Sequence, residues 1–136
     1  MKILITEDDF VSRKILHGHL TQFGDCDVAT DGLEAVDAIK TSLGNNQPYD
    51  IVFLDIMMPN MDGQEALAKI RDIEQCHGIA PGDGAKIVMT TALSDAQNIL
   101  KAFNCQCEAY IVKPITRKKI IDQLVALNFI QHNAAG

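Results

Sequence analysis

Acidic side chains and a lysine follow three separate apolar runs of this sequence. Glu7-Asp8-Asp9, Asp55 and Lys113-Pro114 each come directly after a run rich in β-branched residues, a composition typical of strands. In a parallel sheet the carboxyl ends of the strands share one edge, and α/β folds build their sites there. We therefore expect these three segments to form a single site.

The chemistry of such a site is dominated by its negative charge. Three or four carboxylates at one edge repel one another strongly and need a divalent cation, and Mg²⁺ takes oxygen ligands of this type. Lys113 would help to neutralise them. Because phosphoryl transfer depends mainly on positioning and electrostatic stabilisation, we predict that the site receives a phosphoryl group.

Size and charge narrow the class of protein. A chain of 136 residues, of which 47% are hydrophobic and 5% aromatic, predicts one domain with a mostly aliphatic core. The net charge of −6 argues against general nucleic-acid binding, which needs a basic footprint. The first residues do not form a signal peptide, and no apolar run approaches the roughly 20 residues of a membrane span. We expect a cytoplasmic protein that binds neither nucleic acid nor membrane.

The cysteines do not have the spacing of a metal site. Cys105 and Cys107 are two residues apart, but no second cysteine pair or histidine pair supplies the remaining zinc ligands. We expect these two residues, and also Cys26 and Cys76, to be reduced structural or surface thiols.

Strand-like and helix-like patterns alternate five times along the chain. The expected strands are Lys2–Thr6, Cys26–Ala29, Ile51–Asp55, Lys86–Thr90 and Ala109–Val112. The five helices are expected to begin near Phe10, Asp31, Asp62, Ser94 and Thr116. This alternation predicts right-handed crossovers and a parallel sheet that is covered by helices on both faces.

Apolar residues at helical spacing indicate which side of each helix faces the core. In the first helix, expected from about Phe10 to Phe23, they are Val11, Ile15, Leu16, Leu20 and Phe23. In the second helix they are Leu33, Val36, Ile39 and Leu43.

The full pattern resembles the receiver domain of two-component response regulators over roughly residues 1–128, with 129–136 as a C-terminal tail. Besides the first acidic segment, the matching motifs are Asp55–Pro59, Met61-Asp62-Gly63, Thr90-Thr91-Ala92 and Tyr110–Pro114. Each motif is weak alone, but all of them in order, after the first, third, fourth and fifth expected strands, are very specific. The resemblance implies a flavodoxin-like, doubly wound sheet of five parallel strands in the order 2-1-3-4-5, with five helices.

The resemblance also implies a phosphoacceptor and its metal ligands. Asp55 matches the aspartate that accepts the phosphoryl group. Asp8 and Asp9 match the acidic pair that binds Mg²⁺ together with Asp55, and the backbone carbonyl of Met57 matches a further ligand. Either Asp8 or Asp9 could instead cap the first helix, as an added role or as its only one.

Three further residues match the parts of the family's switch. Thr91 matches the hydroxyl that contacts the acyl phosphate, and Lys113 matches the lysine that pairs with the acyl phosphate. The Lys113-Pro114 peptide bond is expected to be cis. Tyr110 matches the aromatic residue that turns inward when Thr91 moves, although it could also be a static packed ring. Such movement would change the surface of the fourth helix, fifth strand and fifth helix, a switch biased by local charge.

The resemblance predicts a single-domain response regulator of the chemotaxis-regulator type. It would take a phosphoryl group on Asp55 from a phosphohistidine of a sensor kinase or phosphotransfer domain. It would then signal by protein–protein contact or pass the phosphoryl group onward, and it would not otherwise be an enzyme. A Mg²⁺-dependent phosphatase with an aspartyl nucleophile is an alternative, but such enzymes of the haloacid dehalogenase type need a second Asp where this chain has Met57.

A second alternative is a binding module that acts without phosphorylation. The intact set formed by Asp8, Asp9, Asp55, Thr91 and Lys113 argues against it.

The lifetime of the acyl phosphate is expected to depend on Met57 and Leu93, which lie two residues after Asp55 and Thr91. Both are apolar and cannot orient a hydrolytic water, so we expect a persistent phosphorylated state.

Overall fold

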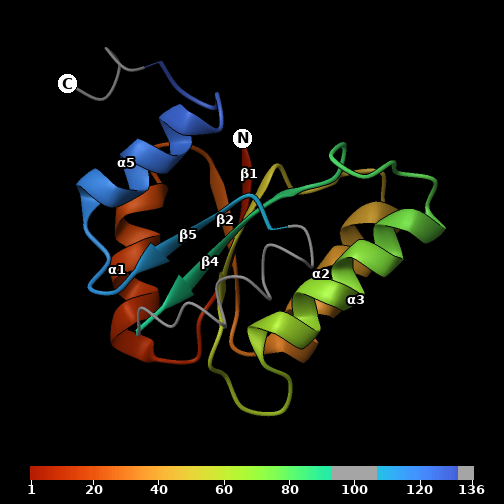
Figure 1. Cartoon of the computed structure of the whole chain (residues 1–136), viewed down its shortest axis with the longest axis horizontal. Helices are drawn as coiled ribbons and strands as arrows, with labels where there is room; N and C mark the ends of the chain where they lie inside the picture. Colours follow the sequence, from red (N-terminus) through yellow and green to blue (C-terminus); the bar gives the residue numbers. More distant parts are fainter. Residues whose placement is uncertain (93–106, 132–136) are drawn as a thin grey trace.

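A central parallel sheet organises the computed structural model, which describes residues 1–92 and 107–131 (Figure 1). Its strands are β1 (Lys2–Thr6), β2 (Asp25–Ala29), β3 (Ile51–Asp55), β4 (Lys86–Thr91) and β5 (Ala109–Val112). The strands are all parallel and lie in the order β2-β1-β3-β4-β5. The predicted fold class and sheet order are therefore confirmed.

The described residues contain four of the five expected helices. These are α1 (Phe10–Leu20), α2 (Gly32–Gly44), α3 (Gly63–Cys76) and α5 (Arg117–Ala126). The helix expected near Ser94 lies outside the described residues. None of the helices in the described part of the chain is both long enough and apolar enough to span a membrane.

Of the helices that the structure describes, two cover each face of the sheet (Figure 1). On one face α1 and α5 bury Ile3, Ile5, Phe53 and Ile111, and on the other α2 and α3 bury the alternate side chains of the same strands. β3 is buried along its whole length, as its unbroken apolar run predicts for a central parallel strand.

The buried faces of α1 and α2 are narrower than predicted. Leu16 and Leu20 are buried, but Val11 is 62% exposed and Ile15 is also exposed. Each helical residue rotates the side-chain direction by about 100°, so Val11 and Ile15 lie on a different side of α1 from Leu16 and Leu20. α1 also ends three residues before Phe23. In α2, Gly32 lies on the buried side of the helix and Leu33 is exposed. By the same rotation of about 100° per residue, the residue after Gly32 points away from the buried side.

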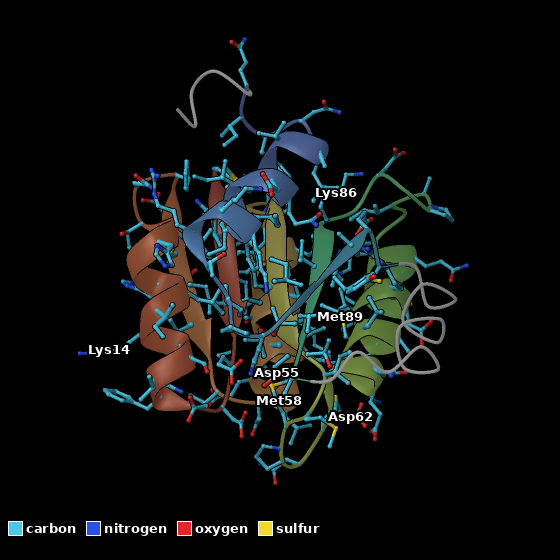
Figure 2. The ribbon with its side chains drawn as sticks, turned by 60° about the vertical axis from the view of Figure 1, so that its left-hand side comes forward. Lys14, Asp55, Met58, Asp62, Lys86 and Met89 are labelled. Atoms are coloured by element: carbon cyan, nitrogen blue, oxygen red, sulfur yellow. The ribbon has the colours of Figure 1, made fainter. Side chains whose placement is uncertain are left out.

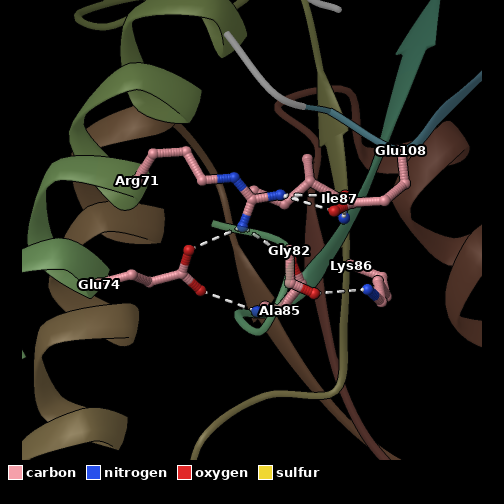
Figure 3. Close-up of polar contacts among 7 residues, drawn as sticks. All are labelled: Arg71, Glu74, Gly82, Ala85, Lys86, Ile87 and Glu108. Atoms are coloured by element: carbon pink, nitrogen blue, oxygen red, sulfur yellow. Dashed lines mark hydrogen bonds and ion pairs between the residues drawn. The ribbon is translucent and has the colours of Figure 1, made fainter. Parts of the chain in front are cut away.

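Ion pairs and hydrogen bonds in a largely buried cluster connect α3 to the starts of β4 and β5 (Figure 3). The Arg71 guanidinium contacts Glu74 Oε1 at 2.7 Å, Glu108 Oε2 at 3.0 Å and the Ala85 carbonyl at 2.8 Å. Each carboxylate also accepts a backbone N–H, Glu74 from Ala85 at 2.7 Å and Glu108 from Ile87 at 2.6 Å. The charges are thus paired and hydrogen-bonded, as burial of ionic groups requires.

Arg71→Ala is expected to lower the free energy of unfolding by about 3 kcal/mol, because it leaves two largely buried carboxylates without a cation. Urea denaturation measures the change. The matched control is Lys118→Ala, which removes the exposed ion pair with Asp122 and is expected to cost at most about 1 kcal/mol. Equal losses in the two variants would contradict a stabilising role for the buried cluster.

Candidate phosphoacceptor site

Three carboxylates meet at the carboxyl edge of the sheet. Glu7, Asp8 and Asp55 each place a ligand atom within 4.8 Å of the others. Asp55 and Glu7 are buried and Asp8 is exposed. Figure 2 shows Asp55 at this edge, with Lys86, the first residue of β4, at the opposite end of the sheet. The chain folds this way because Asp55 ends β3 and the acidic segment follows β1.

The structure places the two members of the predicted acidic pair differently. Asp9 caps α1, and its Oδ2 accepts the backbone N–H of Ser12 at 2.9 Å. These hydrogen bonds lower the pKa of Asp9. The side chain that lies with Asp8 and Asp55 in the described structure is Glu7, and a metal-binding role for Asp9 stays a prediction. Strand alternation explains the position of Glu7, because this residue continues the side of β1 that carries Ile3 and Ile5.

Lys113 binds the two buried carboxylates together. Its Nζ lies 3.0 Å from Glu7 Oε2 and 3.2 Å from Asp55 Oδ2. The Lys113 N–H donates to the Thr91 carbonyl at 2.7 Å, and the Lys113-Pro114 peptide bond is cis, as expected. The ammonium reaches from the end of β5 to Asp55 on β3 and to Glu7 beyond it.

The electrostatic balance of this cluster shows in its pKa values. Burial raises the pKa of Glu7 to about 7, although the hydrogen bond with Lys113 opposes the shift. Burial alone would lower the pKa of Lys113, but Glu7 and Asp55 together raise it. The cluster therefore holds negative charge at a cost that a further cation would relieve.

The loop after β3 hydrogen-bonds to the Asp55 side chain. The Met57 N–H donates to Asp55 Oδ1 at 3.2 Å, while the Met57 side chain is 68% exposed. The Gly63 N–H donates to the Ile56 carbonyl at 2.8 Å. A Cβ atom on Gly63 would collide with the Asp55 carbonyl, so this close approach of α3 to β3 requires glycine. The motif contained Gly63, but the sequence alone did not show why.

The two predicted switch residues lie on neighbouring strands near the site. Thr91 ends β4 and is buried, and Tyr110 is on β5 with 38% of its surface exposed. The structure brings Thr91 to the same edge as Asp55, because Thr90 is the register partner of Asp55. Movement of the pair stays a prediction, and Leu93 lies outside the described residues.

The donor set fits Mg²⁺. Three carboxylates with ligand atoms within 4.8 Å of one another are hard oxygen donors of the kind that this ion prefers. The described groups at the edge include no thiolate or imidazole, because the cluster consists only of Glu7, Asp8 and Asp55. An oxygen-only set of this kind favours Mg²⁺ over zinc.

The fold and the acidic edge together define a flavodoxin-like domain with its site at the carboxyl ends of the strands. Residues 3–125 match the family described as response regulator receiver domain, and the chain belongs to this family. The chemotaxis protein CheY of Treponema pallidum (strain Nichols) is 31% identical over 127 residues, covering 93% of this chain and 81% of that protein.

Other similar proteins are much longer or have been solved as structures. Probable histidine kinase 2 of Oryza sativa subsp. indica is 33% identical over 132 residues, covering 90% of this chain but only 12% of the kinase. The CheX-CheY-BeF3-Mg complex from Borrelia burgdorferi contains a chain that is 31% identical, with a TM-score of 0.81 and coverage of 96% of this chain and 90% of that one. Receiver domains thus occur both as most of a protein and as a small part of one.

Proposed function

We propose that the chain is a response regulator that accepts a phosphoryl group on Asp55 from a phosphohistidine. The observation that carries the proposal is the placement of Asp55, which is 4% exposed and held between Lys113 and the carboxylates of Glu7 and Asp8. This is a nucleophile with a cation on one side and, on the other, two carboxylates that could hold Mg²⁺ beside it. Chemistry on other substrates forms no part of the proposal.

Each residue of the site has a separate role in phosphoryl transfer. A carboxylate oxygen of Asp55 forms the new bond to phosphorus, and the histidine nitrogen leaves with the electron pair of the broken bond. Lys113, 3.2 Å from Asp55, offsets charge on the phosphoryl oxygens, and the buried hydroxyl-bearing Thr91 supplies a hydrogen bond. Mg²⁺ held by Glu7, Asp8 and Asp55 would stabilise the charge that develops on the transferred group.

Surfaces near the site have the character of partner contacts. Phe10 is 58% exposed at the start of α1, directly after the acidic segment, and Val11 beside it is also exposed. Because a phosphohistidine must touch Asp55, the domain that carries it covers this edge. We propose that the output partner contacts the surface of β5 and α5, where Tyr110 is half-exposed. The Borrelia burgdorferi chain is in a complex with a second protein, CheX.

Phosphotransfer from labelled donors tests this function. The chain is incubated with Mg²⁺ and a panel of phosphorylated histidine kinases and phosphotransfer domains. We expect one donor to lose its label within seconds while the chain gains it. Transfer from no histidine donor, with labelling by a small acyl phosphate intact, would overturn the assigned donor class. Label that moves on to a second histidine would identify a relay.

Met57→Asn is expected to shorten the lifetime of phospho-Asp55 several-fold. The exposed Met57 side chain crowds the approach of water to the acyl phosphate and cannot orient it, whereas an amide can. The measurement is the decay of phospho-Asp55 after the donor is removed. Leu33→Asn, which changes another exposed apolar residue, is the control and is expected to decay like the parent. Equal decay in all three proteins would show that Met57 does not govern the lifetime.

A further inference from the structure

Two threonine hydroxyls at the carboxyl edge of the sheet are buried without a hydrogen bond. Thr6 ends β1 and Thr90 lies near the end of β4, and both are fully buried. Neither Oγ1 has a partner among the described residues. An unpaired buried hydroxyl is unfavourable by comparison with a methyl group of the same shape. Such a group in the interior therefore needs an explanation.

The strand register shows that the two hydroxyls lie on opposite faces of the sheet. Thr90 is the register partner of Asp55 on β3, and in-register side chains of neighbouring parallel strands point to the same face. Thr6 is the register partner of Leu54, whose side chain packs in the core under α2 and α3. Thr90 therefore lies beside Asp55, and Thr6 lies on the opposite face.

The path of Lys113 places it over Thr90. Lys113 follows β5, yet its Nζ contacts Asp55 on β3 at 3.2 Å, and β4 lies between these two strands. The side chain must therefore cross β4. Thr90 is the residue of β4 at this level, because it is in register with Asp55 on one side and with Ile111 on the other. The unpaired hydroxyl thus belongs to the β4 residue at the level of the Asp55–Lys113 pair, although no hydrogen bond joins it to either residue.

We propose that Thr90 is a further residue that binds the phosphoryl group, and that its hydroxyl gains a hydrogen bond only when Asp55 is phosphorylated. This inference rests on the proposed function. Without a phosphoryl group the Asp55 Oδ2 atom pairs with Lys113, and the Thr90 hydroxyl has no hydrogen-bond partner in the part of the chain that the structure describes. A phosphoryl group adds charge and strong acceptor oxygens and draws the ammonium towards them. The Thr90 hydroxyl then donates to the acyl phosphate, which stabilises the phosphorylated state relative to the resting one.

Thr90→Val tests the inference, because valine keeps the shape and removes the hydroxyl. Two properties are measured: the melting temperature without metal, and the affinity for beryllofluoride, a phosphoryl mimic, with saturating Mg²⁺. The matched control is Thr6→Val, which removes the other unpaired hydroxyl. Both variants should raise the metal-free melting temperature by roughly 2 to 6 °C. Only Thr90→Val should weaken beryllofluoride binding, by about ten-fold, and Thr90→Ser should restore it.

The outcomes separate this inference from the proposed function. If the parent protein binds no beryllofluoride and is not phosphorylated, the proposed function itself fails. If the parent binds it and Thr90→Val binds it as tightly as Thr6→Val does, Thr90 is only a structural residue and the inference is overturned. A loss of affinity that Thr90→Ser does not restore would also overturn it, because shape rather than the hydroxyl would then be responsible.

Discussion

Asp55→Asn is expected to abolish phosphorylation of the chain by a small acyl phosphate in the presence of Mg²⁺. Asp55 is the buried carboxylate that contacts both Lys113 and the Glu7–Asp8 cluster, and an amide cannot form the acyl phosphate. Intact-mass measurement should find one added phosphoryl group on the parent and none on the variant. Removal of Mg²⁺ should also stop labelling, because the carboxylates would then repel the donor.

Asp62→Asn is the control for this experiment. Asp62 follows the same loop and caps α3, where its Oδ1 accepts the Glu65 N–H at 2.9 Å. Asparagine is an equally good cap, so this variant should be labelled as fully as the parent. Full labelling of Asp55→Asn, or loss of labelling in both variants, would refute Asp55 as the acceptor.

Glu7→Gln is expected to weaken Mg²⁺ binding on the order of 100-fold, since loss of a ligand exceeds the effect of losing an outer-shell partner. Mg²⁺ binds only the folded arrangement, so titration of the melting temperature with Mg²⁺ reports the affinity. Asp9→Ala should bind Mg²⁺ like the parent, but it should unfold at a lower temperature because the cap of α1 is removed.

This pair of variants distinguishes the two possible acidic pairs. A large loss of Mg²⁺ affinity in Asp9→Ala with little change in Glu7→Gln would restore the pair predicted from the sequence. An equal loss in both would mean that Asp9 reorients away from Ser12 when the ion binds. A melting temperature of the parent that does not respond to saturating Mg²⁺ would exclude a metal site at this edge.

The sequence predicted most of the fold because its signals are periodic. Four of the five strands are short apolar runs, and three of the observed caps, Asp31, Asp62 and Thr116, lie where the helices were expected to begin. The exposed residues Val11 and Ile15 were misplaced for a physical reason. Helical periodicity shows which residues share a side of a helix, but not how much of that side the sheet covers.

The site was predicted less completely. Asp55 and Lys113 follow strands directly, so their meeting could be expected from the parallel arrangement alone. The bounds expected for the first strand and the start expected for the first helix agree with β1 and α1, but they do not show which side chains of the acidic triplet lie nearest to Asp55. In the structure Glu7 lies there, and Asp9 hydrogen-bonds to Ser12. The position of Thr90 depends on the register between strands, which a single sequence does not contain.

The double attachment of α3 has a consequence for how a signal leaves the domain. At its first residue the backbone of Gly63 is pressed against the end of β3, and near its last turn Arg71 and Glu74 are tied to Ala85 and Glu108. A helix held at both ends can neither tilt nor slide without breaking the contacts at one end. We therefore expect a charge added at Asp55 to move the half of the molecule that carries β5 and α5 more than it moves α3.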